Sequence, residues 1–380
     1  MIAFGFALRL FVAIWNSFFG PSPGAELDAA SFHEAAVAIA IDPSETGLST
    51  GWIYADLLGL IYRYSISHLF IGSMLSCLAW VLSAYILKQA LRISSADPRT
   101  RSTLLGIYAI LPSSVFLTSI TLREVYQLLF VNILALSLLN IFILKKKGFW
   151  LIAVVAAICM STLHGGLAIF ATIAILFAAL KTNLRHSDKP ASSKRTGSRN
   201  RFAIFSIGII VASIILVPYL IGSDLLSLLD TTVAYQNNVL GADGRTNYKE
   251  ATESVSPSQF LFSLPVTLIQ YLIEPMPWRN LAVADIPVMA ENALRVAAIC
   301  TILKSLKYLD GRPRLIVISS FSLFLLLEFI WAMGTVNWGT AVRHHIPSLG
   351  LLAIAGSTRP LYSRSSKLHQ SQVNSSGVHQ

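Results

Sequence analysis

The stretch "ISHLFIGSMLSCLAWVLSAYIL", from Ile66 to Leu87, contains no Lys, Arg, Asp or Glu. A helix that crosses a bilayer needs about 20 consecutive, mostly apolar residues, so this stretch predicts a membrane-spanning helix. The whole chain has the same character, because 54% of its 380 residues are hydrophobic and 13% are charged. Soluble domains carry about 25% charged residues. The composition therefore predicts an integral membrane protein.

Comparable apolar stretches recur along the chain and predict an all-α, polytopic membrane helix bundle with about 10 transmembrane helices. A further stretch, 258–274, is interrupted by Pro265, and we expect it to be re-entrant or interfacial. The predicted spans are 2–19, 66–87, 102–119, 125–144, 149–163, 166–181, 202–222, 287–303, 315–333 and 345–356.

Positive charge is distributed unevenly between the connectors of these spans. Of the 29 Lys and Arg residues, 21 fall in one alternating set of connectors and six in the other, while Arg9 and Arg295 lie inside apolar stretches. Cytoplasmic loops of membrane proteins carry the excess of Lys and Arg, so the set with 21 is expected in the cytoplasm. The chain is then a multi-pass protein of the inner (cytoplasmic) membrane with both termini cytoplasmic. This topology accounts for the net charge of +10, so we expect no nucleic-acid partner.

One transmembrane domain, residues 1–356, is expected, followed by a disordered cytoplasmic tail over 357–380. An outer loop over 20–65 is expected to contain two interfacial helices. The stretch 182–201 is expected to be a basic cytoplasmic loop. A second long outer loop, 223–286, contains the re-entrant stretch. This organisation places most chemically informative residues on the outer face.

The stretch "TVNWGTAVRHHIPSLG", residues 335–350, puts an Arg and two His at the outer end of a late span. Ionisable residues at the other outer helix ends are expected to border the same cavity. Such a cavity suits an anionic lipid head group, because the planar guanidinium of Arg donates two parallel hydrogen bonds to phosphate. Arg9 and Glu328, which lie inside apolar stretches, are expected to form a buried pair or a cavity wall.

Four features resemble the GT-C class of polytopic glycosyltransferases, which use polyprenyl-phosphate-linked sugars at the outer face. The first outer loop carries Asp28, Phe32 and Ala36 in an Asp-x-x-x-aromatic-x-x-x-Ala pattern, and interfacial helices follow it. "LPSSVFLTSITLRE", residues 111–124, is similar to the Pro-then-Arg-acid pattern of bacterial members. "GTAVRHHIPSL", residues 339–349, is similar to their Gly-x-x-x-Arg-x-x-x-Pro segment.

The resemblance implies transfer of a sugar from a polyprenyl-phosphate donor to a lipid-linked or cell-envelope glycan acceptor, with inversion at the anomeric carbon. Asp28 stands where the class places its catalytic base. Cationic side chains would stabilise the departing phosphate, Arg343 first, helped by His344 or His345 if protonated. The expected phosphate and head-group contacts are Arg343, Arg123, His344, His345, Arg279 and Glu124.

Members of the class often carry paired acids in the first loop, whereas Ala29 follows Asp28 here. We therefore expect no cofactor. A divalent metal ion stays an open alternative, which no paired-acid motif supports. The partners implied are the lipid-linked sugar, the glycan acceptor and membrane lipids.

Other interpretations of the same residues stay open. The alternative enzyme is a repeat-unit polymerase or ligase of the O-antigen type, which needs no Asp at the start of the first loop. A lipid-sugar transporter or a non-catalytic membrane subunit is the second alternative. Asp28 would then only favour the first turn of a helix through its charge, and Arg123 and Glu124 would mark a helix end.

Overall fold

The structure is a computed structural model that describes residues 1–25, 28–45, 52–94, 96–187, 245–249 and 257–358. These residues form helices and one isolated β-bridge between Asn247 and Asn337. The expected all-helical bundle is confirmed for this part of the chain. The predicted span 202–222 and nearly all of the tail lie outside the described residues, as do most of the basic loop and much of the long outer loop.

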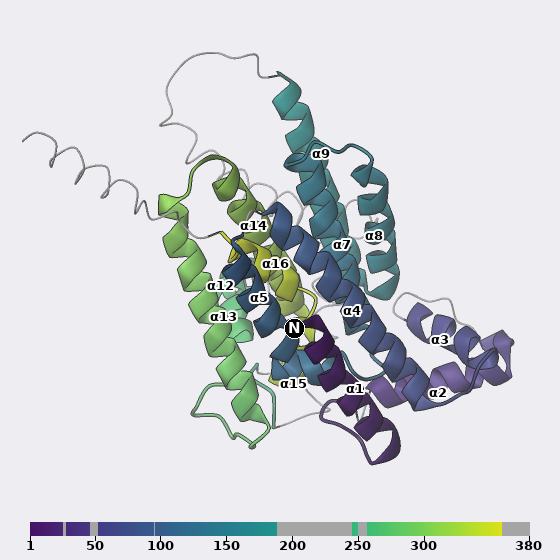
Figure 1. Ribbon diagram of the computed structural model, residues 1–380. Coiled ribbons are helices and arrows are strands. Elements are labelled where there is room, and N and C mark those ends of the chain that lie inside the picture. The colour runs from purple at the N-terminus through teal and green to yellow at the C-terminus, as the bar shows by residue number, and fades with distance from the viewer. Residues whose placement is uncertain (26–27, 46–51, 95, 188–244, 250–256, 359–380) are drawn as a thin grey trace, which may run out of the picture.

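The helices follow one another in the order drawn in Figure 1. Their bounds are α1 Ile2–Phe18, α2 Asp28–Ile41, η1 Pro43–Glu45, α3 Ile53–Arg63, α4 Leu69–Ile93, α5 Pro98–Ile110, α6 Pro112–Leu117, α7 Glu124–Phe142, α8 Phe149–Leu163, α9 Gly165–Ser187, α12 Pro257–Ile273, α13 Asp285–Ser305, η2 Leu306–Tyr308, α14 Gly311–Gly334, α15 Trp338–His344 and α16 Leu349–Ala355.

Four helical segments of the described chain are long and apolar enough to cross a membrane: α4, α7, α13 continued through η2, and α14. Shorter apolar helices cover Ile2–Phe18, Phe149–Leu163, Gly165–Ala179 and Ser263–Ile273. These helices indicate a membrane protein. The larger number of about ten spans stays a prediction.

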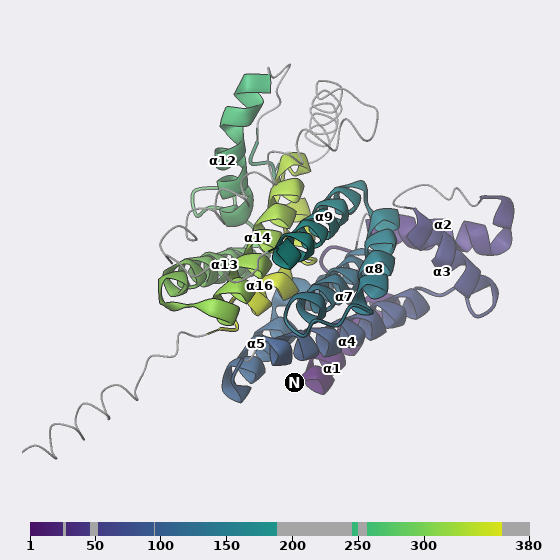
Figure 2. The ribbon, with the colours of Figure 1, turned by 90° about the horizontal axis from the view of Figure 1, so that it is seen from above.

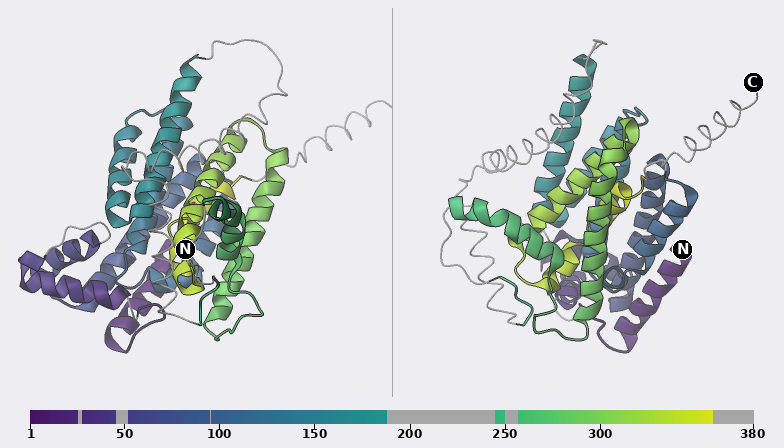
Figure 3. Two further views of the ribbon diagram at one scale, coloured as in Figure 1. Left: turned by 180° about the vertical axis from the view of Figure 1, so that it is seen from behind. Right: turned by 90° about the vertical axis from the view of Figure 1, so that its left-hand side faces the viewer.

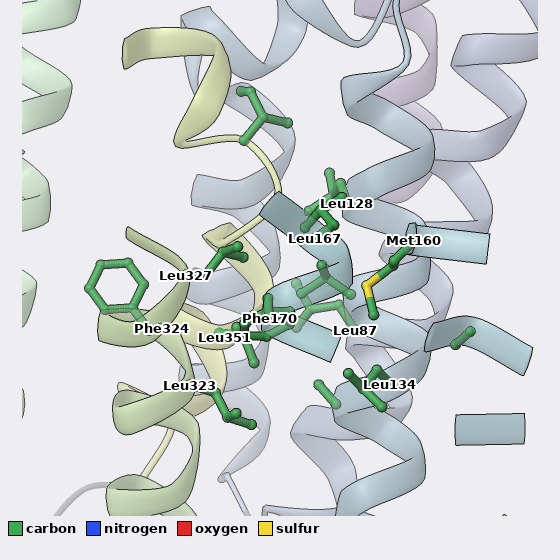
Figure 4. Close-up of a cluster of buried hydrophobic side chains, with 14 of the residues drawn as sticks. Leu87, Leu128, Leu134, Met160, Leu167, Phe170, Leu323, Phe324, Leu327 and Leu351 are labelled. Atoms are coloured by element: carbon green, nitrogen blue, oxygen red, sulfur yellow. The ribbon is translucent and has the colours of Figure 1, made fainter. Parts of the chain in front are cut away.

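The core is a layer of aliphatic and aromatic side chains between the long helices. Figure 4 shows Leu87 of α4, Leu128 of α7, Met160 of α8, Phe170 of α9 and Leu327 of α14 gathered in one cluster. Each of these side chains is almost fully buried. Helices that are distant in sequence are therefore held by shared apolar contacts, and the loops between them remain at the ends of the bundle.

Two expected spans are broken by proline. The stretch 102–119 is divided into α5 and α6 at Pro112, and Leu111 before it leaves the helical region with φ −52° and ψ 119°. A proline disfavours the helical conformation of the preceding residue, which explains the break. The stretch 345–356 likewise contributes only the short α16, which begins two residues after Pro347, while α15 ends just before the stretch at His344.

The helix α12 occupies the stretch that we expected to be re-entrant. It runs from Pro257 to Ile273 with Pro265 inside it, so proline does not end this helix. Figures 2 and 3 show α12 leaving the bundle at a steep angle to α13 and α14.

The helices α2 and α3 form the expected pair in the first loop and lie across the end of the bundle (Figure 1). They approach closely because Gly59 of α3 has no side chain. A Cβ at this position would lie 2.7 Å from Ile39 and 3.0 Å from the carbonyl oxygen of Ala36. Small residues at this crossing therefore fix how α2 sits on α3.

Arg9 and Glu328 do not form the expected buried pair. Arg9 donates hydrogen bonds to the hydroxyls of Ser114 and Thr118 and to the carbonyls of Gly5 and Ala109. Its guanidinium also lies 3.6 Å from the ring centroid of Trp80. Neutral oxygens and an aromatic face thus satisfy this cation, which explains how a buried Arg is tolerated without Glu328.

Candidate functional site

Arg343 joins three helices at one end of the bundle. Its Nη1 lies 2.5 Å from Oδ2 of Asp28, at the start of α2. Its Nη2 and Nε donate to Oε1 of Glu124, at the start of α7, over 2.5 and 3.1 Å. Three residues proposed from separate sequence segments therefore meet in one ionic cluster.

The two carboxylates have different environments. The side chain of Asp28 is 52% exposed, while that of Glu124 is only 3% exposed. Burial alone would lower the pKa of Arg343, but the negative charges of Glu124 and Asp28 outweigh it and raise the pKa above its ordinary value. Arg343 is therefore a permanent cation with one fixed partner and one that water reaches.

Helix ends favour this arrangement of charges. Asp28 lies in the first turn of α2 and Glu124 in the first turn of α7, where the helix dipole stabilises negative charge. Arg343 lies in the last turn of α15, where positive charge is stabilised. The Asn337 side chain caps the start of α15 by accepting a hydrogen bond of 2.7 Å from the Thr340 N–H.

Arg123 lies beside this cluster and contacts the aromatic residue of the first-loop pattern. Its guanidinium is 5.5 Å from the ring centroid of Phe32, four residues after Asp28. Its Nη1 also donates to the carbonyl of Leu163 at the end of α8, over 3.3 Å. The spacing from Asp28 to Phe32 thus places the acid and the aromatic ring on one side of α2.

Two histidines and a tryptophan form the neighbouring wall. The His344 ring stacks on Trp331 with centroids 4.1 Å apart and an interplanar angle of 17°. His164 meets Trp331 edge-on at 4.5 Å and lies 6.2 Å from His344. We did not expect Trp331 at this site, because its position within an apolar stretch gives no polar signal.

The hydrogen bonds of these histidines determine where their protons lie. The Thr335 hydroxyl donates to the carbonyl of Trp331 at 2.7 Å, so it accepts a hydrogen bond from Nδ1 of His344 at 2.8 Å. Nδ1 of His164 accepts from the Gly166 N–H at 3.0 Å. In the neutral rings, the proton is therefore on Nδ1 of His344 and on Nε2 of His164.

Burial keeps both rings neutral near pH 7. It is the largest cause that lowers the pKa of His164 to about 4, with the charge of Arg123 adding to it. Burial, His164 and Arg343 lower the pKa of His344 well below its ordinary value. The expected help from His344 in holding phosphate needs a protonated ring, whereas burial favours the neutral one, so this contact stays a prediction.

His345 does not belong to this cluster. Its Nδ1 lies 2.6 Å from Oε2 of Glu328, and its Nε2 lies 3.2 Å from the carbonyl oxygen of Tyr271. Ser348 donates to the other oxygen of Glu328, and the His345 side chain is 2% exposed. His345 is therefore buried in the core with a protein oxygen near each ring nitrogen, and its expected contact with a head group stays a prediction.

Arg279 belongs to a separate ion pair. It donates to Glu274 over 2.7 Å and to the carbonyl of Tyr248 over 3.5 Å. Tyr248 in turn donates to the carbonyl of Thr335, and the neighbouring Lys249 donates to the carbonyl of Ala332. Among the described residues, Arg279 shares no hydrogen bond or ion pair with Arg343, and the expected single cavity stays a prediction.

A hollow of about 530 Å³ lies beside the first turns of α2. Its lining includes Asn16 and Ser17 of α1 and Ala29, His33 and Glu34 of α2. His33 is held in place at 2.9 Å from the Tyr62 hydroxyl. Asp28, Glu124 and Arg343 do not line this hollow, so it is separate from the ionic cluster although α2 borders both.

The arrangement supplies an exposed carboxylate and a fixed guanidinium at one point. Among the described residues, no three His, Cys, Asp or Glu side chains are grouped to hold a metal ion. The chain matches no protein-family model, no curated protein and no solved structure.

Proposed function

We propose that the protein is a membrane glycosyltransferase that moves a sugar from a polyprenyl-phosphate donor to a lipid-linked or cell-envelope glycan acceptor. The observation that carries the proposal is the ion pair of 2.5 Å between Arg343 and Asp28. It brings a phosphate-binding cation and a carboxylate base to one point at the end of a helix bundle.

The difference between the two carboxylates suggests how the donor enters. Glu124 is buried and holds Arg343 from one side, whereas Asp28 is exposed and holds it from the other. A donor phosphate would displace Asp28 from Nη1 of Arg343, because the exposed partner is the easier one to move. Phosphate binding then releases the Asp28 carboxylate next to the sugar.

Transfer proceeds by a single displacement. The acceptor hydroxyl oxygen bonds to the anomeric carbon while the bond from that carbon to the phosphate oxygen breaks. Asp28 takes the hydroxyl proton, and Arg343 stabilises the negative charge of the departing polyprenyl phosphate. The configuration at the anomeric carbon is inverted. Neutral His164 donates through Nε2 and neutral His344 accepts through Nε2, so both contribute hydrogen bonds rather than charge.

The proposal includes a topology. The connectors that carry 21 of the 29 Lys and Arg residues would face the cytoplasm, with both termini, and the Arg343 cluster would face outward. The protein would have about ten membrane spans if the shorter apolar helices and the stretch 202–222 also cross the inner membrane. A membrane-embedded donor would then reach Arg343 from the outer leaflet.

The experiment that tests this function is analysis of lipid-linked glycans in a strain that lacks the gene. A glycosyltransferase predicts accumulation of a precursor that is short of one sugar. Accumulation of complete repeat units would replace the proposal by a polymerase or ligase. Complete precursors confined to the inner leaflet would replace it by a transporter.

A further inference from the structure

A second hollow lies at the other end of α4 from the Arg343 cluster. Its volume is about 350 Å³, and three cationic residues line it: Lys88 and Arg92 of α4 and Arg101 of α5. Met1, Ile2, Pro98, Ser102 and Leu105 complete the wall. We call this hollow the basic pocket. Figure 2 shows the start of α1 beside α4 and α5, the three helices that supply the lining residues.

Protein groups leave the charges of the basic pocket uncompensated. Within the described chain, the side chains of Lys88 and Arg101 make no hydrogen bond or ion pair, and the side chain of Arg92 donates only to the neutral Gln89 at 3.2 Å. Asp97 is the nearest acid in sequence. Its carboxylate accepts hydrogen bonds from the N–H groups of Arg99 and Thr100, where it caps α5. A bound anion would therefore supply the missing charge.

The positions of the cations make the empty pocket unfavourable. Lys88 and Arg92 are four residues apart on α4, and like charges at this spacing repel each other. Arg101 lies in the first turns of α5, where the helix dipole disfavours positive charge. An anion between the three side chains removes both penalties.

Exposed apolar side chains continue from the basic pocket along α4. Tyr85 precedes Lys88 by three residues, so it lies on the same side of α4, and its side chain is 53% exposed. Leu82 precedes Tyr85 by the same interval and is 57% exposed. A phosphate in the pocket would thus have a surface beside it that suits hydrocarbon chains, which a soluble anion would not use.

We propose that the basic pocket binds the phosphate of an anionic phospholipid whose acyl chains lie against Tyr85 and Leu82. The pocket is distinct from the proposed sugar-transfer site, because α4 has 25 residues and is about 37 Å long at about 1.5 Å per residue. Basic pockets between membrane helices are suited to acidic head groups, since each Lys or Arg adds attraction at an anionic surface.

The test compares two triple variants of the full chain after purification in detergent. The pocket variant combines Lys88→Gln, Arg92→Gln and Arg101→Gln, which removes the three cationic side chains from the basic pocket. The matched control, Arg99→Gln with Lys146→Gln and Lys147→Gln, removes the same net charge from residues that do not line it. Mass spectrometry counts the phosphatidylglycerol that stays bound. Thermal unfolding is followed in three conditions: with phosphatidylcholine vesicles, with vesicles that also contain phosphatidylglycerol, and with inorganic phosphate.

We expect wild type and the control to retain phosphatidylglycerol and to be stabilised by it. The pocket variant should bind it on the order of 100-fold more weakly, because each cation contributes about fivefold. Equal binding by the two triple variants would overturn the proposal, since it would show general surface attraction. Equal stabilisation by inorganic phosphate would overturn the choice of a lipid as ligand.

Discussion

Arg343 and Asp28 are 315 positions apart in the chain, and their side chains form an ion pair of 2.5 Å. The pair connects the last turn of α15 with the first turn of α2, and Glu124 of α7 holds Arg343 from the other side. Because Glu124 is buried and Asp28 is exposed, Asp28 is the partner of Arg343 that a ligand can replace. That asymmetry is the basis of the proposed exchange of Asp28 for a donor phosphate.

Substitutions of Arg343 and Glu124 should have different kinetic effects. Arg343→Lys keeps the charge but loses the planar fork, so we expect turnover to fall roughly 10²–10³-fold, with weaker donor binding. Glu124→Gln leaves the cation in place but loosens its orientation, so turnover should fall while the donor binds no more weakly. Initial rates at varied donor concentration separate the two. A Glu124→Gln variant with unchanged turnover would remove the positioning role of Glu124.

His164 should make stability depend on pH. Its pKa is about 4 in the folded protein and 6.5 in the unfolded chain. Between these values the unfolded chain binds the proton more strongly, so stability rises with pH up to about 6.5 and is lost as pH falls toward 4. His164→Asn keeps a side-chain acceptor for the Gly166 N–H but has no proton to bind. Its thermal midpoint should fall less than that of wild type from pH 7 to 4.5, and parallel curves would contradict the assignment.

Glu328 should matter for folding rather than for sugar transfer. Glu328→Leu leaves His345 and Ser348 buried without their acceptor, which costs roughly 1–3 kcal/mol for each unsatisfied group. Glu328→Gln keeps an acceptor oxygen and should be milder. We expect a lower thermal midpoint for the Leu variant, with activity per folded molecule unchanged. Normal stability together with lost activity would instead place Glu328 in the site.

The crossing of α2 and α3 should control the position of Asp28. In Gly59→Ala, the new Cβ would meet Ile39 at 2.7 Å and the Ala36 carbonyl at 3.0 Å. Overpacking of this kind costs typically 1–3 kcal/mol, and it would move the helix that carries Asp28. Activity and thermal midpoint should both fall. The control is Gly148→Ala, whose Cβ would meet nothing within 4 Å and should change neither.

Local patterns predicted much of this architecture. The uninterrupted apolar stretch before Leu87 forms α4, and Asp28 begins α2, one of the two helices expected in the first loop. The charge bias predicts Asp28, Glu124 and Arg343 on one side of the membrane; the three side chains do meet, while the side itself stays a prediction. The helices could be predicted because helix length and helix starts depend on neighbours in sequence.

Contacts between distant helices could not be predicted in this way. His345 and His344 are adjacent, yet one turns to Glu328 in the core and the other stacks on Trp331. Arg9 is satisfied by hydroxyls and a tryptophan ring, which a search for an opposite charge overlooks. The direction of each side chain depends on helix rotation and packing, and a sequence pattern gives only its approximate depth.

The most direct test of the central claim is restoration of lipid-linked glycan output in a strain lacking the gene, with each variant confirmed in the membrane. Asp28→Asn is the key substitution, because loss of a general base should lower turnover roughly 10²–10⁴-fold. Glu34→Gln is the matched control, since it makes the same change at an exposed residue six positions later in α2. We predict that Glu34→Gln restores output while Asp28→Asn and Arg343→Ala leave a precursor short of one sugar. Full output from Asp28→Asn would contradict the proposed site.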